Sequence, residues 1–200
     1  MRIYIDGENF RKGLEGALRK SGVLKGEAVL KKYDIVGLLK DVLQTRDLEI
    51  FYYASRVKLP MGYQPSERIL EAAEKVKEES RVWLANVVAQ KIKLIKAGNL
   101  KIKESKPCYH CRRKQETLQE KGVDVRVAVD LLEAIYDGKK KKMGLFSSDT
   151  DLCPVLHKAA DKGAKVVYIC FANGVNRAVS AVAAETVTVS MNKVKKYFKG

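Results

Sequence analysis

Arg2-Ile-Tyr-Ile-Asp6-Gly-Glu-Asn9 opens the chain with a short apolar run that ends abruptly in polar side chains. A run of this length, followed by Gly and a helical pattern from about Asn9, is typical of a buried strand that leads into a helix. Strand-like runs recur at 48–53, 143–147, 165–170 and 186–190, with helical patterns between them. Strands that alternate with helices predict a mostly parallel sheet with right-handed crossovers and helices on both faces. The sequence therefore predicts a three-layer α/β fold.

The rest of the chain is assigned from the same periodicities. The expected helices cover about 9–20, 34–44, 66–79, 124–138, 151–162 and 176–184, and 81–88 is expected to be a further strand. Lys alternates with apolar residues at 91–96 and 100–103, and the intervening Ala97-Gly98-Asn99 predicts a β-hairpin there. Residues 104–120 are polar and are expected to form a loop with a short helix near 115–119. We interpret 1–200 as a single domain in which 88–120 is an inserted hairpin and loop.

Size and composition restrict the class of protein. Two hundred residues suffice for one well-packed α/β domain, and 46% hydrophobic with 32% charged residues is typical of soluble globular proteins. No apolar run approaches the roughly 20 residues that span a bilayer, and the N-terminal apolar run is too short for a secretory signal. We therefore expect a cytoplasmic protein with no membrane partner.

The chain is strongly basic. Lys and Arg outnumber Asp and Glu by 39 to 24, which gives a formal charge of +15. A Lys-rich surface that serves solubility is one explanation. The other is a polyanionic partner, since Lys and Arg that neutralise phosphates supply most of the non-specific affinity for nucleic acid.

Five acidic or amide residues stand where apolar runs end or a helical stripe begins: Asp6, Asn9, Asp124, Asp149 and Asp151. The carboxyl ends of the strands in an open α/β sheet line one crevice, where ligands bind. Carboxylates that share a crevice repel one another, and such clusters usually hold a hard divalent cation. An acidic pocket on a basic protein predicts a metal-dependent nuclease.

Each of these residues also has a structural interpretation. Asp6 or Asn9 could cap the helix that follows, and Asp151 could cap the helix after 143–147. Asp124 could simply favour the macrodipole at a helix start. Capping explains Asp149 and Asp151 together less well, because they lie two residues apart in a turn that also carries three hydroxyl side chains.

Other polar residues are assigned to roles around the pocket. Asp130 lies six residues after Asp124, about 240° around a helix, so we expect it to point away and to pair with Lys or Arg. His110 and His157 are the chain's two histidines, which makes a histidine base improbable and favours metal activation of the attacking water. Lys121 is expected near the pocket, where it would meet a phosphate.

Residues after the second strand suggest contacts with a single strand of nucleic acid. Arg56 and Lys58 follow Tyr52 and Tyr53, and such a mixture can neutralise phosphates and stack on bases. The same four side chains are equally compatible with an ordinary strand end.

Cys108-Tyr-His110-Cys111 is half of a zinc pattern. A closed zinc site needs four ligands, and only three candidates lie here, so the fourth would come from a second chain or from His157. A pair of loop thiols is the simpler interpretation. Cys153 and Cys170 lie in apolar segments and are expected to be core thiols.

Three segments resemble, in order and spacing, the blocks of the NYN domain family, in the LabA-like branch of the PIN-like ribonucleases. They are Ile3-Tyr-Ile-Asp6-Gly-Glu-Asn9, Lys121-Gly-Val-Asp124-Val-Arg-Val-Ala-Val-Asp130 and Ser148-Asp149-Thr-Asp151-Leu-Cys-Pro154. The resemblance implies a PIN-like sheet with an Mg²⁺- or Mn²⁺-dependent acidic site that acts on RNA. Asp6, Asn9, Asp124, Asp149 and Asp151 match the acidic-site positions of the family, and Asp130 matches another recurrent position.

Two residues depart from the family pattern. Ser148 stands where the third block usually has Gly, and Leu152 stands where it usually has an aromatic residue. Both belong to the turn that aims Asp149. We therefore hypothesise a metal-dependent endoribonuclease acting on single-stranded RNA, with a homodimer as one allowed assembly. The alternatives are a non-catalytic RNA-binding or regulatory protein and, less favoured by the charge, a small-molecule phosphatase.

Overall fold

The computed structural model describes residues 1–26, 28–57, 65–138 and 141–200. Its strands form one seven-stranded sheet in the order β4-β3-β2-β1-β5-β6-β7. Neighbouring strands are parallel except for the antiparallel pair β3 and β4. The strands are β1 Arg2–Asp6, β2 Glu49–Val57, β3 Lys93–Glu104, β4 Glu116–Lys121, β5 Lys142–Phe146, β6 Lys165–Phe171 and β7 Glu185–Val189.

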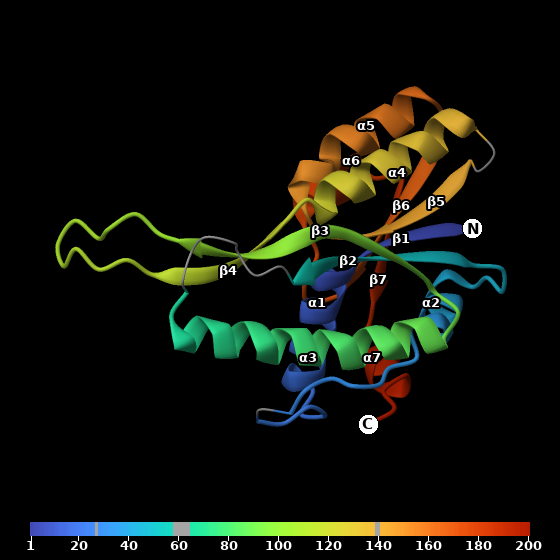
Figure 1. Cartoon of the computed structure of the whole chain (residues 1–200). Helices are drawn as coiled ribbons and strands as arrows, with labels where there is room; N and C mark the ends of the chain where they lie inside the picture. The colour runs from blue at the N-terminus through green and yellow to red at the C-terminus, as the bar shows by residue number, and fades with distance from the viewer. Residues whose placement is uncertain (27, 58–64, 139–140) are drawn as a thin grey trace.

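Helices cover both faces of this sheet (Figure 1). One face carries α1 Gly7–Lys20, α2 Ile35–Leu43, α3 Glu67–Ala89 and α7 Met191–Lys196, whose buried side chains share one core. The other carries α4 Val123–Asp137, the 3₁₀ turn η1 Thr150–Leu152, α5 Cys153–Asp161 and α6 Arg177–Val182, around a second core. The predicted three-layer α/β class is therefore confirmed.

The alternation of side chains along β1 explains the two cores. Ile3 and Ile5 point into the core beneath α1, whereas Tyr4 points into the core beneath α4. Successive residues of a strand face opposite sides, and a central parallel strand has both sides covered, so it must be apolar on both. The apolar run of 3–5 is the sequence signal of this central position.

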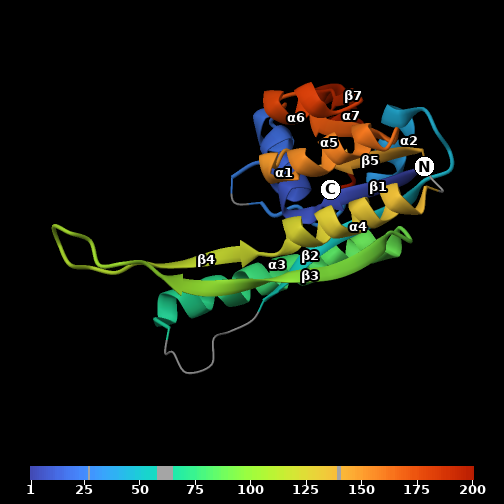
Figure 2. The ribbon, with the colours of Figure 1, turned by 90° about the horizontal axis from the view of Figure 1, so that it is seen from above.

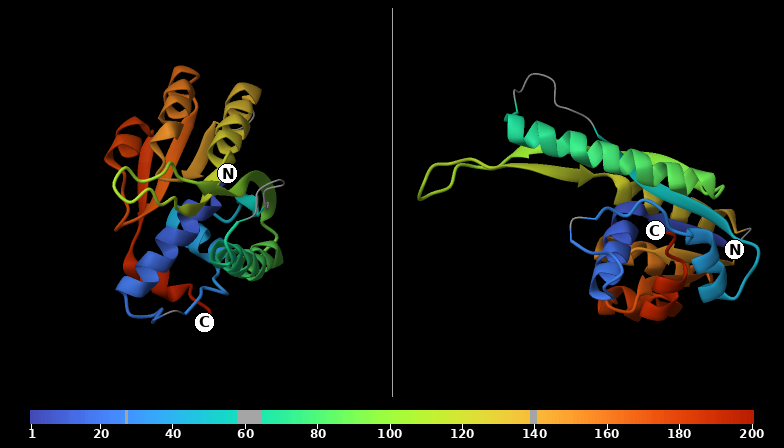
Figure 3. Two further views of the ribbon diagram at one scale, coloured as in Figure 1. Left: turned by 60° about the vertical axis from the view of Figure 1, so that its left-hand side comes forward. Right: turned by 90° about the horizontal axis from the view of Figure 1, so that it is seen from below.

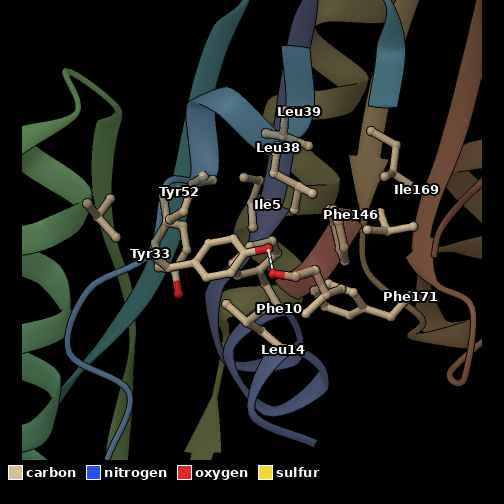
Figure 4. Close-up of a cluster of buried hydrophobic side chains, with 14 of the residues drawn as sticks. Ile5, Phe10, Leu14, Tyr33, Leu38, Leu39, Tyr52, Phe146, Ile169 and Phe171 are labelled. Atoms are coloured by element: carbon tan, nitrogen blue, oxygen red, sulfur yellow. Dashed lines mark hydrogen bonds between the residues drawn. The ribbon is translucent and has the colours of Figure 1, made fainter. Parts of the chain in front are cut away.

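Three phenylalanines fix α1 against the strands at one end of the sheet (Figure 4). Phe10 of α1 packs edge-on against Phe146 at the end of β5, with ring centroids 4.8 Å apart. Phe146 also contacts Phe171 at the end of β6, at 5.0 Å. Aromatic pairs of this geometry add to the stabilisation from buried area. Their position beside the carboxyl ends of β1 and β5 gives the polar residues that follow a rigid base.

The strand order reverses at β1. From β1 the chain adds β2 and β3 on one side, and it later returns to add β5, β6 and β7 on the other. Ligands of open α/β sheets bind at such a switch point, outside the carboxyl ends of the strands. Ile5 pairs with Phe146, so Asp6 and Ser147 come out of the sheet side by side.

The expected strand at 81–88 is wrong, because α3 continues through it to Ala89. Trp83 and Val87, one helical turn apart, are both buried against the sheet, and the Trp83 Nε1–H donates to the Tyr52 hydroxyl at 2.7 Å. Valine favours strands only weakly, and burial of one helical face overrides that preference. Figure 3 shows α3 lying along the sheet as one long helix.

The expected hairpin turn at 97–99 and the short helix at 115–119 are also wrong. β3 continues through Gly98 to Glu104, and its antiparallel partner β4 occupies 116–121. Pairing extends from Asn99 opposite Lys121 to Glu104 opposite Glu116, so the turn lies at 105–115. We call residues 99–121 the hairpin arm, which projects from the body in Figure 2. The helix-favouring Gln and Glu of β4 are overridden by pairing with β3.

Gly98 is the point where β3 passes beneath the start of α4. Its φ of +68° is in the left-handed region, where glycine is favoured. A Cβ added there would lie 2.4 Å from the Lys121 carbonyl oxygen and 2.9 Å from the Val123 nitrogen. The backbone of 121–123, which links β4 to α4, therefore packs directly against the backbone of Gly98.

Replacing Gly98 by Ala is expected to lower the free energy of unfolding by about 1–3 kcal/mol, because the methyl group clashes with backbone in a disfavoured conformation. Gly16→Ala is the matched control: an added Cβ on this α1 glycine meets nothing within 4 Å. We expect this control to gain about 0.5–1 kcal/mol from helix propensity. Urea unfolding measures both, and an undiminished stability of Gly98→Ala would contradict the proposed contact.

Candidate functional site

Asp6 ends β1 and caps α1. Its Oδ1 accepts the Asn9 backbone N–H at 3.1 Å, and its Oδ2 accepts the Ser147 hydroxyl at 3.4 Å. Only 9% of the residue is exposed. Burial raises the pKa of the Asp6 carboxyl, and the nearby charges of Asp149 and Glu8 act in the same direction. Helix capping thus accounts for one oxygen of Asp6, while the whole carboxylate is held in an environment that disfavours its charge.

Asn9 fastens α1 to the turn after β5. Its Nδ2 donates to the Ser148 hydroxyl at 3.0 Å, and its Oδ1 accepts the Ser148 backbone N–H at 3.3 Å. Asn176 acts on the same residue from the other side, donating from Nδ2 to the Ser148 carbonyl at 2.8 Å. The sequence pointed to Asn9 but not to Asn176, which looks like a simple N-cap of α6 until the fold brings it to the turn.

Asp149, rather than Asp151, caps the helical turn after β5, so the expectation that Asp151 is the cap is wrong. The Asp149 Oδ1 accepts the Asp151 backbone N–H at 2.9 Å, and its own N–H donates to the Ser147 hydroxyl at 3.2 Å. Asp151 lies in the first turn, where its carboxylate is exposed. Both aspartates therefore belong to one short turn, Asp149 as its cap and Asp151 within it.

Asp124, Asp149 and Asp151 form a carboxylate triad. Each offers one oxygen, and these oxygens all lie within 4.8 Å of one another. Asp124 comes from the first turn of α4, so the triad joins segments on both sides of the switch point. Hard divalent cations such as Mg²⁺ and Mn²⁺ prefer oxygen ligands from carboxylates. The donor set therefore fits such a cation, and a cation would relieve the mutual repulsion.

A cavity of about 460 Å³ opens beside the triad. It is lined by Asp6, Glu120, Lys121, Gly122, Val123, Asp124, Val125 and Asp149. Asp6 contributes to its wall without belonging to the triad, and none of these lining residues is a histidine. Lys121 is exposed at this cavity, where the sequence placed it.

Glu120 is a further carboxylate that the sequence did not reveal. Burial raises the pKa of its side chain, and the charges of Glu8 and Asp6 reinforce the effect. Its place is set by the pairing of Glu120 with Leu100 in β4 and β3, a register that a loop assignment for 104–120 could not provide.

Asp130 lies apart from the triad, as its helical angle predicted. The Tyr53 hydroxyl donates to its Oδ2 at 2.9 Å, and Arg126 pairs with its Oδ1 at 2.7 Å. It lines a separate hollow of about 500 Å³ beside α4 together with Tyr4 and Phe51. This hollow lies away from the triad, so its similar size does not make it the candidate site.

The residues after β2 only partly meet the expectation of a single-strand contact. Arg56 is exposed near the end of β2, opposite Asn99, and it does not line the cavity. Tyr52 and Tyr53 are fully buried, so stacking of these rings on bases is ruled out. Lys58 lies outside the described residues.

Comparison with known families identifies the chain. The model of the NYN domain matches residues 1–191. The chain belongs to the NYN domain family. The NYN domain is a PIN-like nuclease domain, which agrees with the sheet and the position of the acidic triad. The LabA-like branch remains a prediction from the sequence.

Other comparisons add little about activity. A crystal structure of a protein of unknown function from Vibrio parahaemolyticus is similar over 94% of this NYN domain chain and 91% of its own, with 12% identity and a TM-score of 0.47. No curated protein matches the sequence. Within the described residues, none of the helices has the length and apolar character needed to cross a membrane.

Replacing Asp6 by Asn is expected to stabilise the metal-free NYN domain at pH 7. The folded-state pKa of Asp6 is raised, so the folded chain binds the proton more tightly, and stability falls as the pH rises through that pKa. Asn removes this cost while keeping an oxygen to cap α1. The gain should vanish as the pH falls below the ordinary value of 3.8.

Thermal unfolding of both proteins in EDTA across this pH range measures the difference. A lower melting temperature for Asp6→Asn at pH 7 would contradict the account, because it would show that the hydrogen bonds of Asp6 outweigh its burial.

Proposed function

We propose that this NYN domain is a metal-dependent endoribonuclease that hydrolyses phosphodiester bonds of single-stranded RNA at the acidic triad. The observation that supports this most is the convergence of Asp124, Asp149 and Asp151 at the switch point of the sheet. Three carboxylates that face one another without a compensating cation are costly. Their arrangement is therefore better explained by binding of a divalent cation than by capping alone.

The residues that would hold Mg²⁺ or Mn²⁺ are those of the triad, with Asp6 as a fourth carboxylate in the same cavity wall. When bound, such a cation supplies Lewis acidity that lowers the pKa of a coordinated water and offsets charge on the phosphate. Asp149 is aimed by the hydroxyl of Ser147, which also donates to Asp6, so a single side chain sets the relative position of two carboxylates.

Asn9, Ser148 and Leu152 all contribute to the turn after β5, which positions Asp149 for cation binding. Ser148 is held by Asn9 and by Asn176, so the side chain that replaces Gly is used to fasten the turn. Leu152 is 1% exposed and packs in the core beneath α4 and α5. Both residues therefore support the turn, and we assign Asn9 a positioning role for Ser148 and Asp149.

Basic residues would hold the RNA. Lys121 lies at the cavity next to the carboxylates, where its ammonium group can neutralise a phosphate of a strand that enters the site. Arg56 at the end of β2 is proposed to contact the strand further from the cavity, and Lys58 is proposed from the sequence as a further phosphate contact. The formal charge of +15 supplies a long-range attraction for a polyanion that a small phosphate ester would not need.

Replacing Asp149 by Asn is expected to reduce RNA cleavage at least about 100-fold, because one anionic ligand of the cation is lost. The Asn side chain retains the oxygen that caps η1, so the turn should persist. Asp161→Asn, an exposed aspartate at the end of α5, is the matched control with normal cleavage. The assay follows labelled single-stranded RNA with Mg²⁺, Mn²⁺ or EDTA.

The outcome separates three hypotheses. Cleavage that needs both the cation and Asp149 supports the nuclease. Salt-sensitive RNA binding without cleavage, unchanged by Asp149→Asn, would contradict it and favour a non-catalytic RNA-binding domain. Hydrolysis of a chromogenic phosphate monoester but not of RNA would instead indicate a phosphatase.

A further inference from the structure

The tip of the hairpin arm carries chemistry that the acidic site does not use. Residues 105–115 are exposed throughout, and Tyr109 is 82% exposed. The arm is held at the outer end of its paired strands, where the Ser66 backbone N–H before α3 donates to Glu116, opposite Glu104. Beyond this contact the tip extends away from the body, as Figure 2 and the right-hand view of Figure 3 show. Cys108 and Cys111 therefore lie in an exposed turn at the tip of the arm.

The backbone at the tip forms a closed turn around the two thiols. The Cys108 N–H donates to the Arg113 carbonyl and the Arg112 N–H donates to the Cys108 carbonyl, both at 2.9 Å. Arg112 takes a φ of +57°, in the left-handed region that non-glycine residues rarely adopt. The turn places both cysteines at one end of the arm. Their C-x₂-C spacing is that found in structural zinc sites.

The same turn directs backbone donors at one sulfur. The N–H groups of Cys111 and His110 hydrogen-bond to the Cys108 thiol and lower its pKa. Donors of this kind favour the thiolate, and thiolate sulfur is the form that binds metal. Soft sulfur ligands select Zn²⁺ over the hard cations expected at the carboxylates.

In the part of the chain that the structure describes, no third metal ligand lies beside the two cysteines. Among the described residues, the acidic triad is the one group of three or more His, Cys, Asp or Glu side chains close enough to share an ion. His110 therefore does not complete the pair. Cys170 is buried and Cys153 half-buried in the body, and His157 lies on α5, all remote from the tip. A tetrahedral zinc site needs two ligands from another molecule.

We propose that Cys108 and Cys111 from two copies of this chain bind one Zn²⁺ ion, which joins the tips of two hairpin arms. Four thiols release four protons to solvent as four Zn–S bonds form, and the resulting site carries a charge of about −2. Arg112 and Arg113 stand beside it in each copy and would offset this charge. Without the ion these basic tips repel one another, so association depends on zinc.

The second copy is the occupant that best meets the requirements of the site. It supplies the two missing thiolates in the same preorganised turn, and an exposed arm tip can approach its own counterpart without any contact between the bodies. A disulfide between Cys108 and Cys111, or one zinc per monomer completed by solvent, are the competing states. Both predict a monomer.

The test measures mass and zinc content together. The full chain, purified with a phosphine reductant and freed of metal, is titrated with Zn²⁺ while light scattering reports its mass. We expect a change from 22.4 kDa to twice that value, with about 0.5 zinc bound per chain. Co²⁺ in place of Zn²⁺ should give the intense visible and near-ultraviolet bands of tetrahedral thiolate coordination.

Two variants make the result specific. Cys108→Ser with Cys111→Ser should remain folded, since both residues are exposed, but should stay monomeric and lose the cobalt bands. It also measures any zinc bound at the carboxylates. Cys153→Ser is the matched control and should still dimerise. Asp149→Asn should dimerise as well, so failure of the nuclease proposal would leave this result unaffected.

Three outcomes would overturn the proposal. These are a zinc-loaded monomer with one ion per chain, dimerisation that survives loss of both tip cysteines, and a mass that does not respond to zinc under reducing conditions.

Discussion

Negative charge gathered at the switch point is the constraint around which this NYN domain is arranged. Asp6 must follow β1 directly to cap α1, and the pairing of β1 with β5 then places the turn containing Asp149 beside it. Asp124 and Asp151 complete the triad from α4 and η1. Burying and clustering carboxylates opposes folding, so the surrounding structure must hold them rigidly. The aromatic contacts of Phe10, Phe146 and Phe171 provide that rigidity from below.

Neutral polar side chains link these acids to one another. Ser147 donates to Asp6 and accepts from the backbone of Asp149, while Asn9 and Asn176 hold Ser148 from two helices. Such a network orients the carboxylates but adds no positive charge. Their negative charge is therefore left for a cation to neutralise. Gly98 also helps to position Asp124. Its left-handed conformation and missing side chain let β3 pass directly beneath the residues that precede Asp124.

The sequence predicted the parts of the fold that depend on local pattern. The strand with its apolar run at 3–5 and the helix at 124–138 follow from periodicity, although Val125 and Val129 of that helix are exposed and Val127 and Leu131 are buried. The proximity of Asp6 and Asp149 follows from the rule that the carboxyl ends of parallel strands meet at one edge of the sheet. The predictions of a hairpin turn at 97–99 and a strand at 81–88 were wrong, because tertiary packing determines the structure of both segments. A glycine between alternating runs looks like a turn, yet here it carries a strand past a helix start. The place of Glu120 at the cavity depends on the register of β4 against β3, and the role of Asn176 depends on its contact with Ser148. Neither can be read from a local sequence pattern.

Binding of a divalent cation by the triad underlies both the proposed activity and the arrangement of the acidic residues. Crystals of the protein soaked in Mn²⁺, with data collected to locate its anomalous scattering, test this most directly. We expect a peak among the carboxylates of Asp124, Asp149 and Asp151 that is lost in Asp149→Asn. An empty triad under the same conditions, or manganese bound instead beside Asp130, would contradict it.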